Sequence, residues 1–136
     1  MRIFIGNKVH PGTTGLHIQA RPASWLADFG SVPILKPTEA MVPLVMALVQ
    51  DRKDKKPVDM RKVGDYHFAY DAHLRGKDLR PGKLLNHIGK PIGQDHTLIC
   101  TCSREEAAAG RCHRVWATFW LEEAGWEVYG DWMETK

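Results

Sequence analysis

The chain has 136 residues, 43% of them hydrophobic and 26% charged, which is the composition of one globular domain and not of a disordered segment. Its formal charge of +3 permits an anionic ligand, but the strong basic excess and Lys/Arg stripe of a typical nucleic-acid-binding protein are missing. The longest apolar stretch, residues 41–49, is far shorter than the roughly 20 residues that a membrane span requires. We therefore expect a single domain over residues 1–136 that has no membrane partner.

The cysteines indicate a reducing compartment. There are three of them, an odd number, and all lie between residues 100 and 112, whereas a secreted disulfide-bonded protein spreads an even number along its chain. The short apolar run at residues 2–5 is ended at once by Gly6 and does not resemble a signal peptide. The sequence therefore predicts a cytoplasmic protein whose thiols are free for catalysis or for a metal.

The first third of the chain reads as short strands joined by loops. Leu16 and Ile18 alternate as in a strand, and Pro33, which has no N–H group to donate, is compatible only with a strand at a sheet edge. In chain order, we predict a strand at residues 2–5, a loop at 6–15, a strand at 15–20, a helical turn at 22–29 and an edge strand at 32–35.

The middle of the chain has helical periodicity. Thr38 is a good N-cap, and the apolar residues after it recur every three or four positions. Asp65 begins a second periodic segment, and Gly76 is suited to end it. The predicted helices of this region cover residues 38–49, 65–76 and 81–88.

The last third gives the clearest pattern. An apolar strand at residues 97–100 is followed by a polar loop at 101–110, a helix at 112–124 and a returning strand at 126–129. This βαβ unit predicts an α/β fold, a single three-layer domain whose mostly parallel sheet is flanked by helices. The strand that ends at Cys100 should be central and parallel to the strand at 126–129.

The loop after that strand carries the candidate site. Ligands of open α/β sheets bind beyond the carboxyl ends of the strands, where Cys100 and Cys102 lie. Cys112, His113 and Arg114 begin the next helix, whose N-terminal field attracts anions and lowers the pKa of a thiol. We predict Cys112, with Cys100 and His113, as catalytic candidates, and Arg114 and Cys102 as ligand-binding residues.

Two further residues are predicted to bind the ligand. Asn7 lies in the N-terminal loop, and Tyr66 lies on the apolar side of the second predicted helix. Loops held by a rigid scaffold carry much of protein function, so Asn7 is placed to face a pocket that Tyr66 would line.

The same cysteines have two other interpretations. Three sulfurs and an imidazole are the ligand types of tetrahedral zinc, but a single residue between Cys100 and Cys102 is shorter than the usual spacing. Adjacent helical residues also diverge by about 100°, which separates Cys112 from His113. We therefore expect no metal, with zinc as the second option. In the third interpretation the cysteines are plain core residues.

The C-terminal motif resembles domain-of-unknown-function family 488. The residues that carry the resemblance are Leu98-Ile99-Cys100, Cys112-His113-Arg114, Trp120-Leu121 and Gly125-Trp126-Glu127-Val128. The resemblance implies the same strand, loop, helix and strand, with the site at the Cys-His-Arg helix start. Two departures are that Cys102 stands where many members have an acidic residue, and that the loop from Ser103 to Arg111 is longer.

The sequence thus favours an enzyme-like domain that binds a small anionic ligand, a nucleotide or a phosphorylated metabolite, at the Cys/His/Arg site. The alternative is a non-catalytic module that binds protein or nucleic acid and whose cysteines are structural, with or without zinc. Nucleic acid is the less favoured partner, and a steep salt dependence of binding would identify it.

Overall fold

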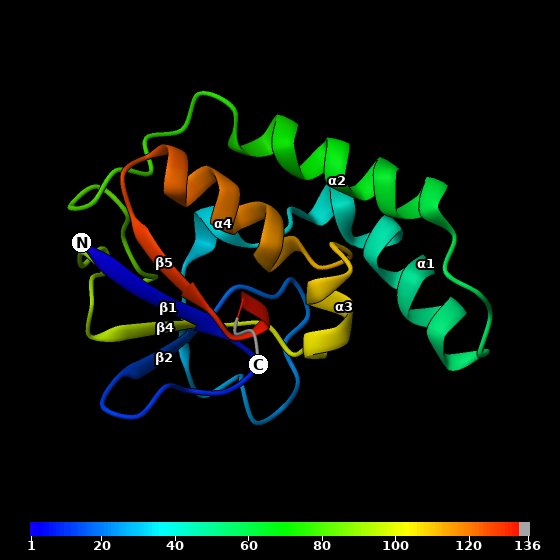
Figure 1. Cartoon of the computed structure of the whole chain (residues 1–136), viewed down its shortest axis with the longest axis horizontal. Helices are drawn as coiled ribbons and strands as arrows, with labels where there is room; N and C mark the ends of the chain where they lie inside the picture. The colour runs from blue at the N-terminus through cyan, green and yellow to red at the C-terminus, as the bar shows by residue number, and fades with distance from the viewer. Residues whose placement is uncertain (134–136) are drawn as a thin grey trace.

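A five-stranded, all-parallel sheet lies at the centre of the computed structural model (Figure 1). The structure describes residues 1–133, so the last three residues of the predicted domain, 134–136, lie outside the described residues. The sheet order is β3-β2-β4-β1-β5. The strands are β1 Arg2–Gly6, β2 Thr14–His17, β3 Gly30–Ser31, β4 His96–Ile99 and β5 Glu127–Gly130.

The prediction that the strand before Cys100 is central and parallel to the last strand is confirmed. β4 lies in the middle of the sheet, with β2 on one side and β1 on the other. β1 separates β4 from β5, because Ile5 is in register with Leu98 and Ile3 is in register with Val128. The helical connection between β4 and β5 therefore spans one intervening strand.

The helices are α1 Val42–Lys53, α2 Met60–Leu74, α3 Arg104–Ala108 and α4 His113–Glu123, with 3-10 turns at η1 Pro33–Leu35, η2 Glu39–Met41 and η3 Asp131–Met133. α2 and α4 lie side by side next to the sheet (Figure 1). The buried side chains of these two helices form one hydrophobic core with Ile3 and Ile5 of β1 and Leu98 of β4. The predicted α/β class, with a parallel sheet and flanking helices, is confirmed.

The opposite face of the sheet is covered by loop residues. His10, from the connection between β1 and β2, stacks on Phe4 with ring centroids 3.7 Å apart. The backbone N–H group of His10 also donates a hydrogen bond to Thr97 Oγ1 at 3.1 Å. On this side, the loop that carries His10 thus contacts both β1 and β4.

Two predicted elements are wrong. The segment at residues 32–35 is not a strand, because Pro33 begins the short turn η1, and the edge strand β3 lies just before it. Residues 81–88 do not form a helix. Gly82 has a φ of 86°, which interrupts helical geometry, and Leu85 instead forms an antiparallel bridge with Pro91.

Two other helices begin at residues that the sequence did not predict, because N-cap side chains set their starts. α2 begins at Met60, earlier than Asp65, because the Asp59 side chain accepts hydrogen bonds from the N–H groups of Arg61 and Lys62. The loop predicted at residues 101–110 contains the short helix α3, whose N-cap Ser103 accepts a hydrogen bond from the N–H group of Glu106. Within residues 1–133, the structure contains no helix with the length and apolar character needed to cross a lipid bilayer.

Close packing around Gly15 in β2 provides a test of the fold. A Cβ atom at this position would lie 2.6 Å from Ile99 Cδ1 and 2.9 Å from Val9 Cγ2. Gly15→Ala should therefore lower the free energy of unfolding by about 1–3 kcal/mol, the usual cost of overpacking, as measured by urea denaturation.

The control is a glycine with free space around it. A Cβ at Gly64, within α2, would meet no atom within 4 Å, so Gly64→Ala should raise stability by about 0.5–1 kcal/mol through helix propensity alone. Shortening the opposing side chain with Ile99→Val should reduce the cost of Gly15→Ala. Equal costs in the two backgrounds would contradict the packing described here.

Candidate functional site

Sulfur and imidazole groups converge just beyond the carboxyl end of β4. Cys100 Sγ lies 3.3 Å from Cys112 Sγ and 3.9 Å from His113 Nδ1. The three ligand atoms all lie within 4.8 Å of one another, and all three residues are buried. Cys102 is half-buried and packs against the hydrophobic core beside them. The structure thus brings three of the sequence-predicted residues together, with Cys102 beside them, and we call these four residues the thiol cluster.

The backbone at the start of α4 explains how neighbouring residues share this cluster. Cys112 is the N-cap, with extended backbone angles of φ −119° and ψ 137°, and His113 is the first helical residue. The divergence expected for adjacent helical residues does not apply, because only one of the two is helical. The sequence-based argument that separated Cys112 from His113 is therefore wrong.

The imidazole of His113 is fixed by a backbone acceptor. Its Nε2 lies 2.7 Å from the carbonyl oxygen of Ile18, which follows β2. A carbonyl only accepts, so Nε2 carries the proton and Nδ1 presents a lone pair to the thiols. Burial lowers the pKa of His113, which favours the neutral ring.

The thiols differ in their ionisation. Hydrogen bonds from Cys102 and Cys112 lower the pKa of Cys100 well below its ordinary value, and the positive charge of Arg114 acts in the same direction. Burial raises the pKa of Cys112 well above its ordinary value. The position of Cys112 at a helix N-terminus predicted a lowered pKa instead. Burial destabilises the thiolate of Cys112 by more than the helix N-terminus stabilises it, so its pKa is raised.

Arg114 is fully buried and lies inside the protein framework. Its Nη1 donates hydrogen bonds to the carbonyl oxygens of Cys100, at 2.8 Å, and Cys102, at 2.7 Å. Its Nη2 lies 3.1 Å from Asp131 Oδ1, and its guanidinium carbon lies 5.4 Å from the centre of the Trp132 ring. Arg114, predicted as an anion ligand, is thus directed at backbone carbonyls and at η3.

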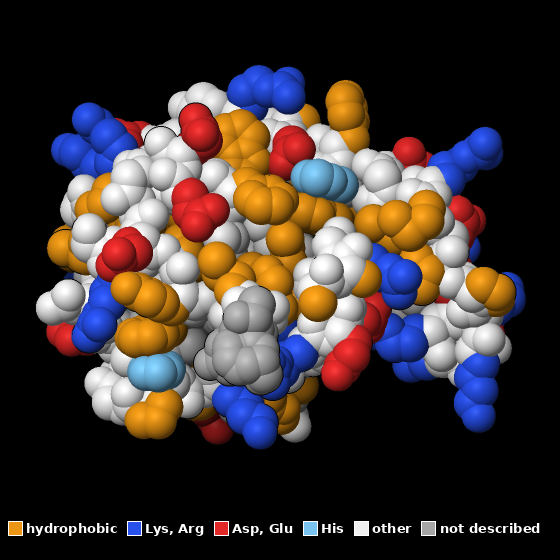
Figure 2. Space-filling view, viewed as in Figure 1, with side chains coloured by type: hydrophobic (Ala, Val, Ile, Leu, Met, Phe, Trp, Pro, Cys, Tyr) orange, Lys and Arg blue, Asp and Glu red, His pale blue; other side chains and the backbone are white. Residues whose placement is uncertain are grey.

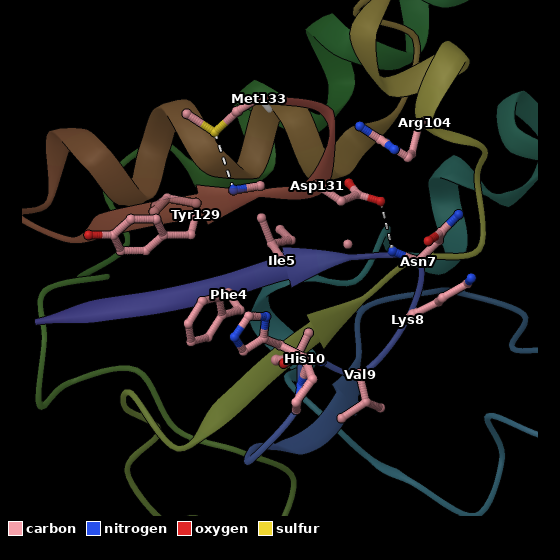
Figure 3. A pocket seen from close by; sticks show the side chains of 15 residues that line it. Phe4, Ile5, Asn7, Lys8, Val9, His10, Arg104, Tyr129, Asp131 and Met133 are labelled. Carbon is pink, nitrogen blue, oxygen red and sulfur yellow. Dashed lines mark hydrogen bonds between the residues drawn. The ribbon is translucent and has the colours of Figure 1, made fainter. Parts of the chain in front are cut away.

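A separate cavity of about 790 Å³ lies at the carboxyl ends of β1 and β5 (Figure 3). The polar and aromatic residues that line it are Asn7, Lys8, His10, Thr97, Arg104, Asp131, Phe4 and Tyr129. Of the two extra residues predicted to bind a ligand, Asn7 lines this cavity. Tyr66 lies elsewhere, buried against Trp116 and beside the ring of His113.

The cavity combines an aromatic wall with a basic rim. Phe4, between His10 and Tyr129, forms the wall, with ring centroids 3.7 Å and 5.7 Å away (Figure 3). Lys8 and Arg104 supply positive charge at the rim. The negative charge of Asp131 is already paired with Arg114 and with the backbone N–H group of Asn7. The cavity therefore suits a ligand that has a ring and a negative charge.

Sequence reasoning missed most of this cavity. Lys8, Arg104 and Tyr129 come from three distant segments and share no motif. The position of Lys8 could have indicated the cavity, because it closely follows the carboxyl end of β1, and α/β proteins bind their ligands at such strand ends. Comparison of the chain with protein-family models, with curated proteins and with solved structures found no match. The resemblance to family 488 therefore stays a prediction.

Proposed function

We propose that the protein is an enzyme-like α/β domain that binds a small anionic ligand in the cavity beyond β1 and β5. Among such ligands, a nucleotide is favoured over a phosphorylated metabolite without a ring. This proposal is based on one observation: a single cavity of about 790 Å³ has both an aromatic wall and a basic rim. Known ligand pockets have volumes of roughly 300–1,000 Å³.

The aromatic wall supports the choice of a nucleotide. Tyr129 is 45% exposed on the outer face of β5, and Phe4 is half-buried beside it. A base that covers these rings would remove apolar surface from water and stack on π-faces, as bases do on the aromatic residues of other proteins. The phosphate would then lie toward Lys8, at the carboxyl edge of the sheet.

The role of Arg114 in this proposal differs from that of a direct ligand. Because its guanidinium pairs with Asp131, it removes a negative charge that would otherwise repel an anion from the rim. Arg114 therefore acts on the ligand indirectly, by holding and neutralising the Asp131 carboxylate. The three thiols are free, which agrees with a reducing cytoplasm as the place of action.

Nucleotide titrations test the proposal directly. AMP and GMP should bind more tightly than adenosine or inorganic phosphate, and the amide signals of Phe4, Tyr129 and Gly130 should shift on binding in NMR spectra. Lys8→Ala should raise the Kd for AMP about tenfold, which corresponds to about 1.4 kcal/mol. The matched control is Lys90→Ala, which removes an exposed lysine that does not line the cavity.

Two outcomes of these titrations would contradict the proposed nucleotide site. If neither nucleotide shifts these signals, or if Lys8→Ala and Lys90→Ala have the same effect, the cavity is not the anion site. Oligonucleotide binding that weakens steeply with salt would instead support the nucleic-acid module, because phosphate-backbone contacts release counterions. Nucleotide binding through a single phosphate should depend on salt only weakly.

A further inference from the structure

We infer that Cys100, Cys102, Cys112 and His113 form a structural zinc site. The thiol cluster contributes nothing to the lining of the cavity, so this site is separate from the proposed ligand site. Three sulfurs and one nitrogen are a known ligand set of structural zinc.

The spacing of the ligand atoms fits one tetrahedral ion. Zinc bonds of about 2.3 Å to sulfur and 2.0–2.1 Å to nitrogen place two sulfurs about 3.8 Å apart, and sulfur and nitrogen about 3.6 Å apart. The observed distances from Cys100 Sγ are 3.3 Å to Cys112 Sγ and 3.9 Å to His113 Nδ1. These two distances thus lie within about half an ångström of the tetrahedral values, and the third pair of ligand atoms lies within 4.8 Å.

The surroundings of the ligands are those of a metal centre. The hydrogen bond between His113 Nε2 and the Ile18 carbonyl holds the ring in the tautomer that leaves Nδ1 free, which is the usual arrangement for a ligating histidine. Arg114 donates hydrogen bonds to the carbonyls of both Cys100 and Cys102, and these bonds fix the backbone of the short Cys-x-Cys segment. Cys102 is therefore held beside the three grouped ligands, and we assign its sulfur as the fourth ligand.

Charge and burial complete the argument. Zinc with three thiolates and a neutral imidazole has a net charge of −1, and the buried guanidinium of Arg114, which also pairs with Asp131, lies beside it and favours that negative charge. Cys100, Cys112 and His113 are each at most 5% exposed, and Cys102 is half-buried. A closed site of four protein ligands is typical of structural zinc, whereas catalytic zinc keeps an open position.

Metal analysis of the purified full-length chain tests the inference. We expect one zinc per chain by mass spectrometry, and we expect a chelator to lower the melting temperature and to expose thiols to Ellman's reagent. Zinc added back should reverse both effects. Cobalt in place of zinc should give the strong visible bands of a tetrahedral site and the near-ultraviolet bands of thiolate coordination.

Cys102→Ser separates the four-ligand site from its alternatives. Because Cys102 is the outermost ligand, this variant should still fold, as followed by circular dichroism, but should bind zinc at least about tenfold more weakly. Thr101→Ala, which changes an exposed neighbour, should bind zinc as the parent does. Unchanged affinity in Cys102→Ser would overturn the assignment. So would a chain that takes up neither zinc nor cobalt, or one isolated with a Cys100–Cys112 disulfide.

Discussion

Arg114→Met is expected to lower the free energy of unfolding by about 3–5 kcal/mol, the usual result of removing one partner of a buried ion pair. The guanidinium is completely buried and bonds to three backbone carbonyls, those of Cys100, Cys102 and Ser103, as well as to Asp131. Methionine fills a similar volume but leaves these oxygens without donors in a site that water does not reach. Urea denaturation followed by tryptophan fluorescence would measure the loss.

Asp131 provides the control for this variant. Its side chain is 24% exposed, so Asp131→Asn leaves Arg114 bonded to the carbonyls of Cys100 and Cys102 and should cost much less. The cost of Arg114→Met should also be smaller in the Asp131→Asn background, because no carboxylate is then left unpaired. If Arg114→Met does not fold, Arg114→Lys, which keeps the charge but loses the planar fork, should show an intermediate loss. A change below about 1 kcal/mol in both Arg114 variants would contradict the buried role.

Trp116→Ala should lower the free energy of unfolding by about 3–5 kcal/mol, as expected when a large buried ring is truncated to a methyl group. Trp116 joins α4 to α2, because its ring lies 4.4 Å from the stacked ring of His67 and 4.9 Å from the edge-on ring of Tyr66. Its indole N–H group donates a hydrogen bond to the Gly110 carbonyl at 3.2 Å. The substitution removes all three contacts together.

Phe119 is the matched control on the same helix. It is 57% exposed, whereas Trp116 is 2% exposed, so Phe119→Ala should change stability by about 0.5 kcal/mol or less. Figure 2 shows hydrophobic side chains gathered on the face of the molecule over α2 and α4, so exposure of an apolar ring is not unusual here. Similar losses in the two variants would mean that Trp116 does not hold the helices together.

The elements with strong periodicity could be predicted from the sequence. In addition, the strand before Cys100 and the strand at the N-terminus are short, mostly apolar runs, and such runs suit strands buried in a parallel sheet. The segment at residues 81–88 failed because its apolar residues suggested a helix, although Gly82 adopts a left-handed conformation that ends one. α3 was missed because its stability depends on the Ser103 cap and not on an apolar stripe.

The candidate site was only partly predictable. Nearness in sequence and the βαβ pattern were enough to group Cys100, Cys112 and His113. The direction of the Arg114 side chain was not predictable, since its acceptors are carbonyls whose orientation depends on the folded loop. The cavity depends on contacts between β1 and β5, at opposite ends of the chain, and a pattern within one segment does not reveal such contacts.

The strand order also has a consequence for synthesis on the ribosome. β1 emerges before its partners β4 and β5, which lie in the last third of the chain, with Phe4 in register with Thr97 and Tyr129. Such non-local pairing slows folding, because a long loop must close before any contact forms. Until β4 has emerged, the apolar first strand has both edges unpaired, and unpaired strand edges promote aggregation. The nascent chain is therefore expected to depend on chaperones until its last third has been translated.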